Sequence, residues 1–263
     1  MWQRLFDIRF SDGQPVVQFI LIAVVVIGCY FIGNINFARI IAKAKKIDIT
    51  KSGSGNPGTM NMARTLGTKW GALTLILDAV KGAAGAILGW YILWFGRYPR
   101  DQHQLFYFGN DLIGMLIGGT AVVLGHIYPV LYNFKGGKGV ASTMGVCFVL
   151  SYTMSWWVPL VSFVAAITIL EFLKNGTVAS FITITPPIAV FTYQIATRVD
   201  SYGYPLAPPM TRIIAPIVCV FLFLLVLWMH RTNIRRAFLG AENKTSAGFS
   251  KLIKKLKKKP SIE

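Results

Sequence analysis

Residues 213–230 read IIAPIVCVFLFLLVLWMH, an unbroken apolar run without Asp, Glu, Lys or Arg. About 20 such residues suffice to cross the hydrocarbon core of a bilayer as a helix. Further apolar runs precede this one, at about 16–33, 70–95, 112–132, 139–155, 157–173 and 178–197. We therefore expect an all-α, polytopic membrane protein with seven transmembrane helices. A tight turn near Trp156 to Pro159 is expected to join the fourth and fifth spans.

The composition agrees with this class of protein. Of the 263 residues, 54% are hydrophobic and only 14% are charged, against about a quarter in soluble domains. The short alternating strands of a membrane barrel are absent. The three cysteines all lie in apolar runs, and their spacing suggests neither a metal site nor a disulfide framework. No cleavage site follows the first run, so we expect it to be a retained span.

The basic residues indicate the orientation. The net charge is +17, from 27 Lys and Arg and 10 Asp and Glu. If the C-terminus is cytoplasmic, the inner segments carry 20 Lys and Arg and the outer segments carry 6. Those inner segments are 34–69, 133–138, the loop at Lys174 and 231–263. The positive-inside rule then places the N-terminus outside and the C-terminus in the cytoplasm.

The chain divides into a membrane domain at 1–242 and a basic tail at 243–263. In the tail, Phe249, Leu252, Ile253 and Leu256 recur at helical spacing among lysines. This pattern predicts an amphipathic helix on anionic membrane lipids, with a solvated charged tail as the alternative. No aromatic platform accompanies the lysines, so no nucleic-acid partner is expected.

Two inner segments combine glycine with basic residues, KSGSGNPGTMNMAR at 51–64 and FKGGKG at 134–139. Glycine allows successive N–H groups to turn toward an anion. In the predicted orientation the second, fourth and sixth spans start at the cytoplasm, and glycine-rich sequence immediately precedes two of those starts. Helix N-termini favour phosphate binding. Flexible tight loops are the alternative. The candidate ligand groups are Gly53, Ser54, Gly55, Asn56, Arg64, Gly136, Gly137, Lys138 and Gly139, with Thr177 and Ser180 at the third start.

The second glycine segment is not a Walker A motif. Lys138 is followed by Gly139 instead of Ser or Thr, and no strand precedes it. ATP hydrolysis is therefore not supported.

Several further polar residues are candidates. His230 and Asn233 share a helix face, whereas Arg235 and Arg236 equally fit a topology anchor. Asp78 and Lys81 are intramembrane residues expected to form a structural ion pair, with a functional role as the alternative. His126 fits either a proton carrier or a satisfied buried histidine. No metal and no cofactor are expected.

Three ordered stretches resemble the PlsY-type bacterial acyl-phosphate:glycerol-3-phosphate acyltransferases. They are GSGNPGTMNMARTLG at 53–67 followed by Asp78 and Lys81, GHIYPVLYNFKGGKGVAS at 125–142, and HRTNIRR at 230–236 followed by Gly240 and Glu242. The similarity extends from about Tyr30 to Glu242. The resemblance implies seven spans around a cytoplasmic cleft in a bacterial plasma membrane, and no metal or cofactor.

The implied reaction transfers a fatty acyl group from acyl phosphate to the 1-hydroxyl of glycerol 3-phosphate. Lysophosphatidic acid and phosphate would form, as the first acylation of phospholipid synthesis. The resemblance assigns substrate contacts to Ser54, Arg64, Lys138, Ser180, His230 and Asn233, and a phosphate-holding turn to Gly136–Gly139. Asn61 is retained from the family motif and is also expected to bind substrate or phosphate. Met60 departs from it, because the family usually has a hydroxyl there. A monomer is plausible.

The residues also bear on mechanism. Many glycerolipid acyltransferases use a His-x-x-x-x-Asp pair, but Phe108, Leu131 and Arg235 stand five residues after the three histidines. A site without a protein base must rely on positioning and charge stabilisation. A transporter of a phosphorylated anion is the alternative function, although it would usually show repeats and midplane sites. A head-group phosphotransferase would need clustered aspartates, which are absent from the spans.

Overall fold

The computed structural model describes residues 15–95, 111–152, 155–197 and 209–241. The basic tail at 243–263 and Glu242 lie outside the described residues.

Apolar helices occupy the positions of all seven predicted spans. They are α2 (Pro15–Asn34), α5 (Thr68–Phe95), α6 (Asp111–Ile127), α7 (Val140–Tyr152), α8 (Trp157–Leu173), α9 (Gly176–Thr197) and α10 (Pro209–Met229). Within the described ranges, the five helical segments that include α2, α5, α6, α9 and α10 are long and apolar enough to cross a membrane. Helices α7 and α8 are shorter, with 13 and 17 residues. The described residues thus form an all-helical structure with membrane-compatible helices.

Two details differ from the prediction, the end of the third span and the extent of the turn before the fifth, and a proline lies at each. Helix α6 ends at Ile127 instead of 132, because Pro129 disfavours helical backbone at the preceding Tyr128. A short 3₁₀ turn, η1 (Val130–Tyr132), follows it. Helix α8 begins at Trp157, the predicted start of the fifth span, so Pro159 lies in its first turn and not in the predicted tight turn. Proline is tolerated there because the first N–H groups of a helix have no intrahelical partner.

Two short helices break up the first inner segment. Helix α3 (Phe37–Ala44) follows α2, and α4 (Thr59–Leu66) follows the glycine-rich stretch. That stretch therefore precedes α4, and the expectation that it immediately precedes the second span is wrong. Gly58 and Gly67 bound α4, which buries Met62 against Ala38, Ala42 and Ile49 in a small core of its own.

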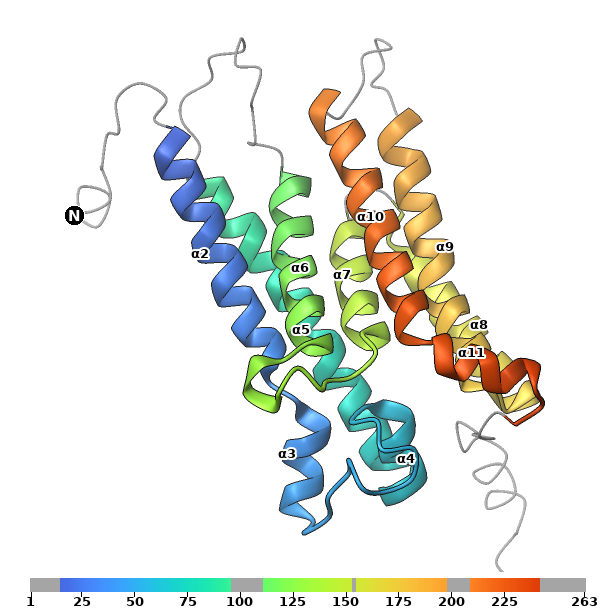
Figure 1. Cartoon of the computed structure of the whole chain (residues 1–263). Helices are drawn as coiled ribbons and strands as arrows, with labels where there is room; N and C mark the ends of the chain where they lie inside the picture. The colour runs from blue at the N-terminus through green and yellow to red at the C-terminus, as the bar shows by residue number, and fades with distance from the viewer. Residues whose placement is uncertain (1–14, 96–110, 153–154, 198–208, 242–263) are drawn as a thin grey trace, which may run out of the picture.

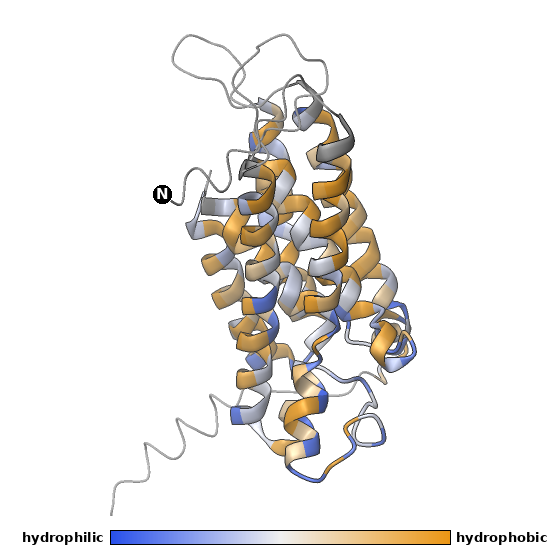
Figure 2. Ribbon diagram, turned by 90° about the vertical axis from the view of Figure 1, so that its left-hand side faces the viewer, coloured by the Kyte–Doolittle hydropathy of each residue, from blue (hydrophilic) through white to orange (hydrophobic). Residues whose placement is uncertain are grey.

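Figure 1 shows α2, α5 and α6 side by side, with α7 next to them and α8, α9 and α10 beyond. Helices α3, α4 and α11 (Arg231–Phe238) lie at the lower end, where α5, α7 and α9 begin. Figure 2 shows apolar residues along the bundle and hydrophilic residues gathered toward that end. The polar candidates therefore share one end of the bundle.

Glycines set the spacing of the first four apolar helices. A Cβ added to Gly118 of α6 would lie 3.0 Å from Gly89 Cα of α5, and one added to Gly125 would lie 3.0 Å from Gly33 Cα of α2. One added to Gly145 of α7 would lie 3.0 Å from the Ala83 nitrogen of α5. Small residues let membrane helices approach closely and pack backbone against backbone. These contacts pack α2, α5, α6 and α7 closely together next to the polar end.

Candidate active site

Asn61 holds the first glycine loop in shape. Its Oδ1 accepts a hydrogen bond from the Ser54 N–H at 2.8 Å, and its Nδ2 donates to the carbonyls of Ile49 at 3.0 Å and Ser52 at 2.9 Å. The side chain is 1% exposed. At Gly53, with φ +57°, a side chain would collide with the Asn61 amide. Asn61 and Gly53 therefore shape the loop, and the role in binding substrate or phosphate that was expected of both stays a prediction.

The same loop is anchored at its start by Asp48. Its Oδ1 accepts from the Thr50 hydroxyl at 2.6 Å and from the Thr50 N–H at 3.0 Å. These hydrogen bonds hold the pKa of Asp48 below its ordinary value. The loop then presents Ser54 at its exposed tip, with Asn56 half-buried.

The second glycine loop folds back onto the end of α6. The Gly136 N–H donates to the Ile127 carbonyl at 3.1 Å, and the Gly137 N–H donates to the His126 carbonyl at 3.0 Å. A Cβ at Gly137 would overlap the His126 imidazole. The expectation that these two N–H groups face an anion is therefore wrong, because backbone donors near an apolar core are satisfied internally. The glycines instead allow the loop backbone to approach the end of α6 closely.

Lys138 follows this turn directly. Its side chain is half-buried, and Gly139, with φ +85°, leads into α7. The Thr143 N–H donates to the Gly139 carbonyl at 2.8 Å, which is the first turn of that helix. The glycine turn thus fixes Lys138 beside a helix N-terminus, where the partial positive charge favours anions.

A buried ionic cluster lies directly beneath the second loop. Lys81 Nζ is 2.9 Å from Asp78 Oδ1, and His126 Nδ1 is 3.6 Å from the same oxygen. Lys81 also donates to the carbonyls of Ile35 at 2.7 Å and Gly33 at 3.3 Å. The predicted ion pair is confirmed as a contact, and it joins α2, α5 and α6 under the imidazole that supports Gly137.

Helix α3 is tied to the second loop by an arginine that sequence reasoning missed. Arg39 Nη2 donates to the Lys135 carbonyl at 2.9 Å, and its guanidinium lies 4.7 Å from the centre of the Tyr132 ring. The Lys135 side chain itself is exposed. Only the position of Arg39 in a basic inner segment could have suggested this role.

Tyr30 and Asn34 of α2 fix the start of the loop. The Tyr30 hydroxyl donates to the Tyr128 carbonyl at 2.7 Å and accepts from the Val130 N–H at 3.1 Å. Asn34 Oδ1 accepts from the Leu131 N–H at 3.2 Å. The available signal was their i, i+4 spacing, which puts two polar side chains on one face at the end of an apolar span.

The packing of the Met60 side chain explains why this position departs from the family motif. It packs against the cluster of Ala166, Leu170 and Ala179. A Cβ at Gly176 would lie 2.9 Å from Met60 Cε, so α4 is in close contact with the start of α9. A thioether fits this apolar joint better than a hydroxyl, which would need a partner there.

Ser180 lies near the same end of α9. Its hydroxyl donates to the Gly176 carbonyl at 2.7 Å, within the helix. The oxygen retains its capacity to accept a hydrogen bond, and the side chain is half-buried.

His230 marks the junction of α10 and α11. It is 3% exposed, and its ring lies 5.4 Å from the Phe181 ring of α9. Nδ1 is 2.9 Å from the Val226 carbonyl, which can only accept, so Nδ1 carries the proton. Nε2 of the neutral ring is then an acceptor. Asn233 Oδ1 accepts from Arg236 Nη2 at 2.7 Å.

The second loop and this junction meet. The Tyr128 hydroxyl, just before the second loop, donates to Met229 Sδ at 3.6 Å. Together with the Arg39 and Met60 contacts, this bond brings four segments far apart in sequence to one end of the bundle. The candidate residues therefore come from both glycine loops, the start of α9 and the α10–α11 junction.

Two other features bear on the chemistry. Within the described ranges, no three His, Cys, Asp or Glu side chains gather so that they could hold a metal ion.

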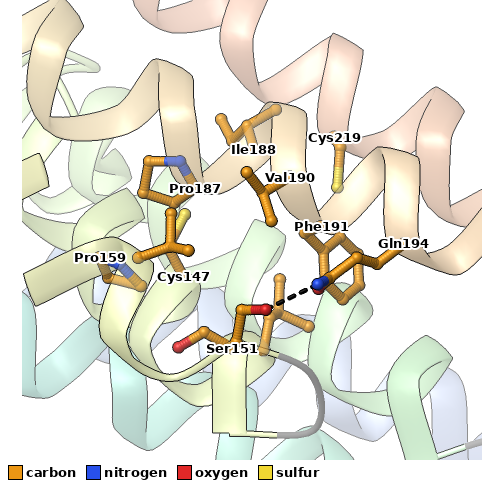
Figure 3. A pocket seen from close by; sticks show the side chains of 12 residues that line it. Cys147, Ser151, Pro159, Pro187, Ile188, Val190, Phe191, Gln194 and Cys219 are labelled. Carbon is orange, nitrogen blue, oxygen red and sulfur yellow. Dashed lines mark hydrogen bonds between the residues drawn. The ribbon is translucent and has the colours of Figure 1, made fainter. Parts of the chain in front are cut away.

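A small cavity between α7, α8, α9 and α10 is lined mainly by apolar groups, with a hydrogen bond from Gln194 Nε2 to Ser155 Oγ at 2.6 Å (Figure 3). None of the candidate residues lines this cavity.

The proteins to which this chain is similar are membrane acyltransferases. The family model described as glycerol-3-phosphate acyltransferase matches residues 23–240. The glycerol-3-phosphate acyltransferase of Aquifex aeolicus is 34% identical over 83% of this chain and 96% of the relative. That of Shouchella clausii is 35% identical over 85% and 95%.

Two solved structures are also similar. Both are crystal structures of PlsY (YgiH), an integral membrane glycerol 3-phosphate acyltransferase. The glycerol 3-phosphate form gives a TM-score of 0.65 at 31% identity, covering 88% of this chain and 98% of that one. The lysophosphatidic acid form gives 0.64 at 31% identity, covering 86% and 96%. The chain therefore belongs to the glycerol-3-phosphate acyltransferase family and is a PlsY-type acyltransferase.

The buried ion pair generates a test of stability. Asp78→Asn leaves the Lys81 ammonium buried without its counter-charge, and breaking such a pair typically costs about 3–5 kcal/mol. We expect a large loss of thermal stability in detergent, measured by the unfolding midpoint. The double variant Asp78→Asn with Lys81→Met removes both charges and should recover most of that loss. Equal destabilisation in the single and double variants would show that the pairing is not what matters.

Proposed function

We propose that this chain transfers a fatty acyl group from acyl phosphate to the 1-hydroxyl of glycerol 3-phosphate. The acceptor oxygen attacks the acyl carbon, the bond to the donor's phosphate breaks, and lysophosphatidic acid and inorganic phosphate leave. The observation that carries this proposal is Lys138, which the glycine turn on His126 fixes at the start of α7.

The charged side chains are assigned to the two phosphates. Lys138 and the first turn of α7 hold one phosphate, and Arg64 of α4 helps to hold the other. A charge fixed before the reaction stabilises the transition state without reorganisation. Gly139 supplies the backbone turn that allows this, while Gly55, Asn56 and the tip residue Ser54 form the rim of the acceptor side.

Hydroxyl and imidazole groups orient the acceptor. His230 Nε2 accepts a hydrogen bond from a substrate hydroxyl, while Asn233 and Ser180 line the same region. No protein base is required, because the proton of the attacking hydroxyl passes to a phosphate oxygen of a substrate. Asp78, Lys81 and His126 act as positioning residues beneath the loop, and Glu242 is assigned no contact.

The proposed setting is a bacterial plasma membrane. Seven helices cross it, with α7 and α8 as the short members, the N-terminus outside and the polar end in the cytoplasm. The tail at 243–263 adds attraction to anionic membrane lipids, and the monomer carries a complete site. Neither metal nor cofactor takes part.

The donor is the first point to test. A thioester is a poorer leaving group than a mixed anhydride, and the site offers no His-Asp pair to compensate. We expect purified protein to acylate glycerol 3-phosphate rapidly with acyl phosphate and not with acyl-CoA or acyl carrier protein. A radiolabelled acceptor and lipid extraction measure this. Rapid turnover with acyl-CoA alone would refute the donor assignment, and no turnover with any donor would favour the transporter alternative.

The orientation is tested by labelling. In a variant without cysteines, Ser54→Cys and Lys138→Cys should resist a membrane-impermeant thiol reagent added to intact cells. Gln102→Cys should react, because residues 96–110 are assigned to the outside. Reagent added to opened cells provides the control for accessibility. The opposite pattern would reverse the orientation and move the site to the outer face.

Lys138 gives the sharpest test of the site. Loss of a charge-assisted contact costs about 1.5–3 kcal/mol, so Lys138→Ala should lower kcat/KM roughly 10- to 150-fold, and more if charge develops in the transition state. Lys138→Arg keeps the charge but changes its shape and should remain impaired. Lys135→Ala is the matched control, since that side chain is exposed three residues earlier. Near-normal turnover of Lys138→Ala would remove the phosphate assignment.

A further inference from the structure

An open groove lies where α10 meets α11, on the outer surface of the bundle. Leu224, Leu227 and Trp228 of α10 form one wall, and Arg231, Ile234 and Arg235 are among the residues of α11 that form the other. His230, between the two helices, is buried against Phe181. The groove and the candidate active site therefore involve different residues of the same junction.

The groove combines an apolar wall with a fixed positive rim. Arg231 Nη1 donates to the Trp228 carbonyl at 3.0 Å, and its guanidinium lies 4.5 Å from the centre of the Trp228 ring. Arg235 follows at i+4 and so lies on the same face of α11. No carboxylate is among the lining residues. The rim is thus a paired guanidinium site with no internal counter-charge in its lining.

Helix α11 leaves its largest apolar side chain largely uncovered. It has no buried residue, and Phe238 is 88% exposed. The candidate span of α10 ends at Met229, directly before α11. An amphipathic helix of this kind, with an adjacent tryptophan, is typical of the membrane–water interface. The groove accordingly runs from the interface into the apolar zone along α10.

We propose that this groove binds one anionic phospholipid of the surrounding bilayer. The lipid phosphate lies between Arg231 and Arg235, and one acyl chain follows Leu227 and Leu224 along α10. Guanidinium groups recognise phosphate through paired hydrogen bonds, which explains two arginines at this spacing. The apolar wall favours a membrane lipid over a soluble anion as the bound molecule. This site does not depend on the identity of the acyl donor.

The test uses photoactivatable phosphatidylglycerol with the reactive group in its acyl chain, and a phosphatidylcholine analogue of the same chain length. Purified full-length protein in mixed micelles is irradiated with each, and the labelled peptides are mapped. We expect phosphatidylglycerol to label 224–239 in clear excess over phosphatidylcholine. Arg231→Gln with Arg235→Gln should reduce that excess roughly tenfold or more, since each basic side chain near a membrane surface contributes about fivefold.

The matched control is Lys43→Gln with Lys46→Gln, which removes the same charge from exposed positions near the end of α3. It should keep the excess label at 224–239. Equal labelling by the two lipids, or an excess that survives the loss of both guanidiniums, would overturn the proposal. So would displacement of the label by inorganic phosphate, which would indicate a soluble-anion site, or by a non-hydrolysable acyl phosphate analogue, which would assign the groove to the substrate.

Discussion

The polar end of the molecule depends on the contacts that the buried Lys81 ammonium makes. An ammonium has three donors, and Lys81 has three acceptors within reach, namely Asp78 Oδ1 and the carbonyls of Gly33 and Ile35. One of these carbonyls belongs to the last turn of α2 and the other follows that helix directly, where a positive charge is favourable. The third acceptor, Asp78 Oδ1, also lies 3.6 Å from His126 Nδ1. One buried charge therefore fixes the end of α2, the middle of α5 and the end of α6 relative to one another.

The glycines then act at two different levels. Within the bundle, Gly118, Gly125 and Gly145 bring helix backbones together, which matters because lipid supplies no hydrophobic drive for helices to associate. In the second loop, Gly136 and Gly137 let the chain turn onto His126 with their N–H groups satisfied. The loop is thus a continuation of the packed bundle. Its rigidity, more than its own N–H donors, is what places Lys138 at the start of α7.

The sequence predicted the positions of the apolar helices well, because length and hydropathy alone specify them. It located the polar candidates because charge, glycine and the family motifs coincide in the inner segments. It did not predict helix α4, whose apolar side chains are few and scattered among polar ones over only eight residues. Nor did it predict the roles of Asn61, Tyr30 and Arg39, because each bonds to backbone carbonyls or N–H groups. Such partners carry no residue identity that a single sequence could reveal.

The location of the site matches the proposed reaction in one further physical respect. A fatty acyl donor partitions into the bilayer, whereas glycerol 3-phosphate is confined to water, so the two meet only at a membrane surface. The assembled candidates lie at the ends of apolar helices, where α4 packs on the start of α9 through Met60 and where α10 ends at Met229, next to His230. In the proposed reaction, charges fixed there would hold the phosphates at the boundary while the acyl chain stays in the apolar zone. A site at the bilayer midplane would have required the acceptor phosphate to lose its hydration, and the energetic cost of that step is large.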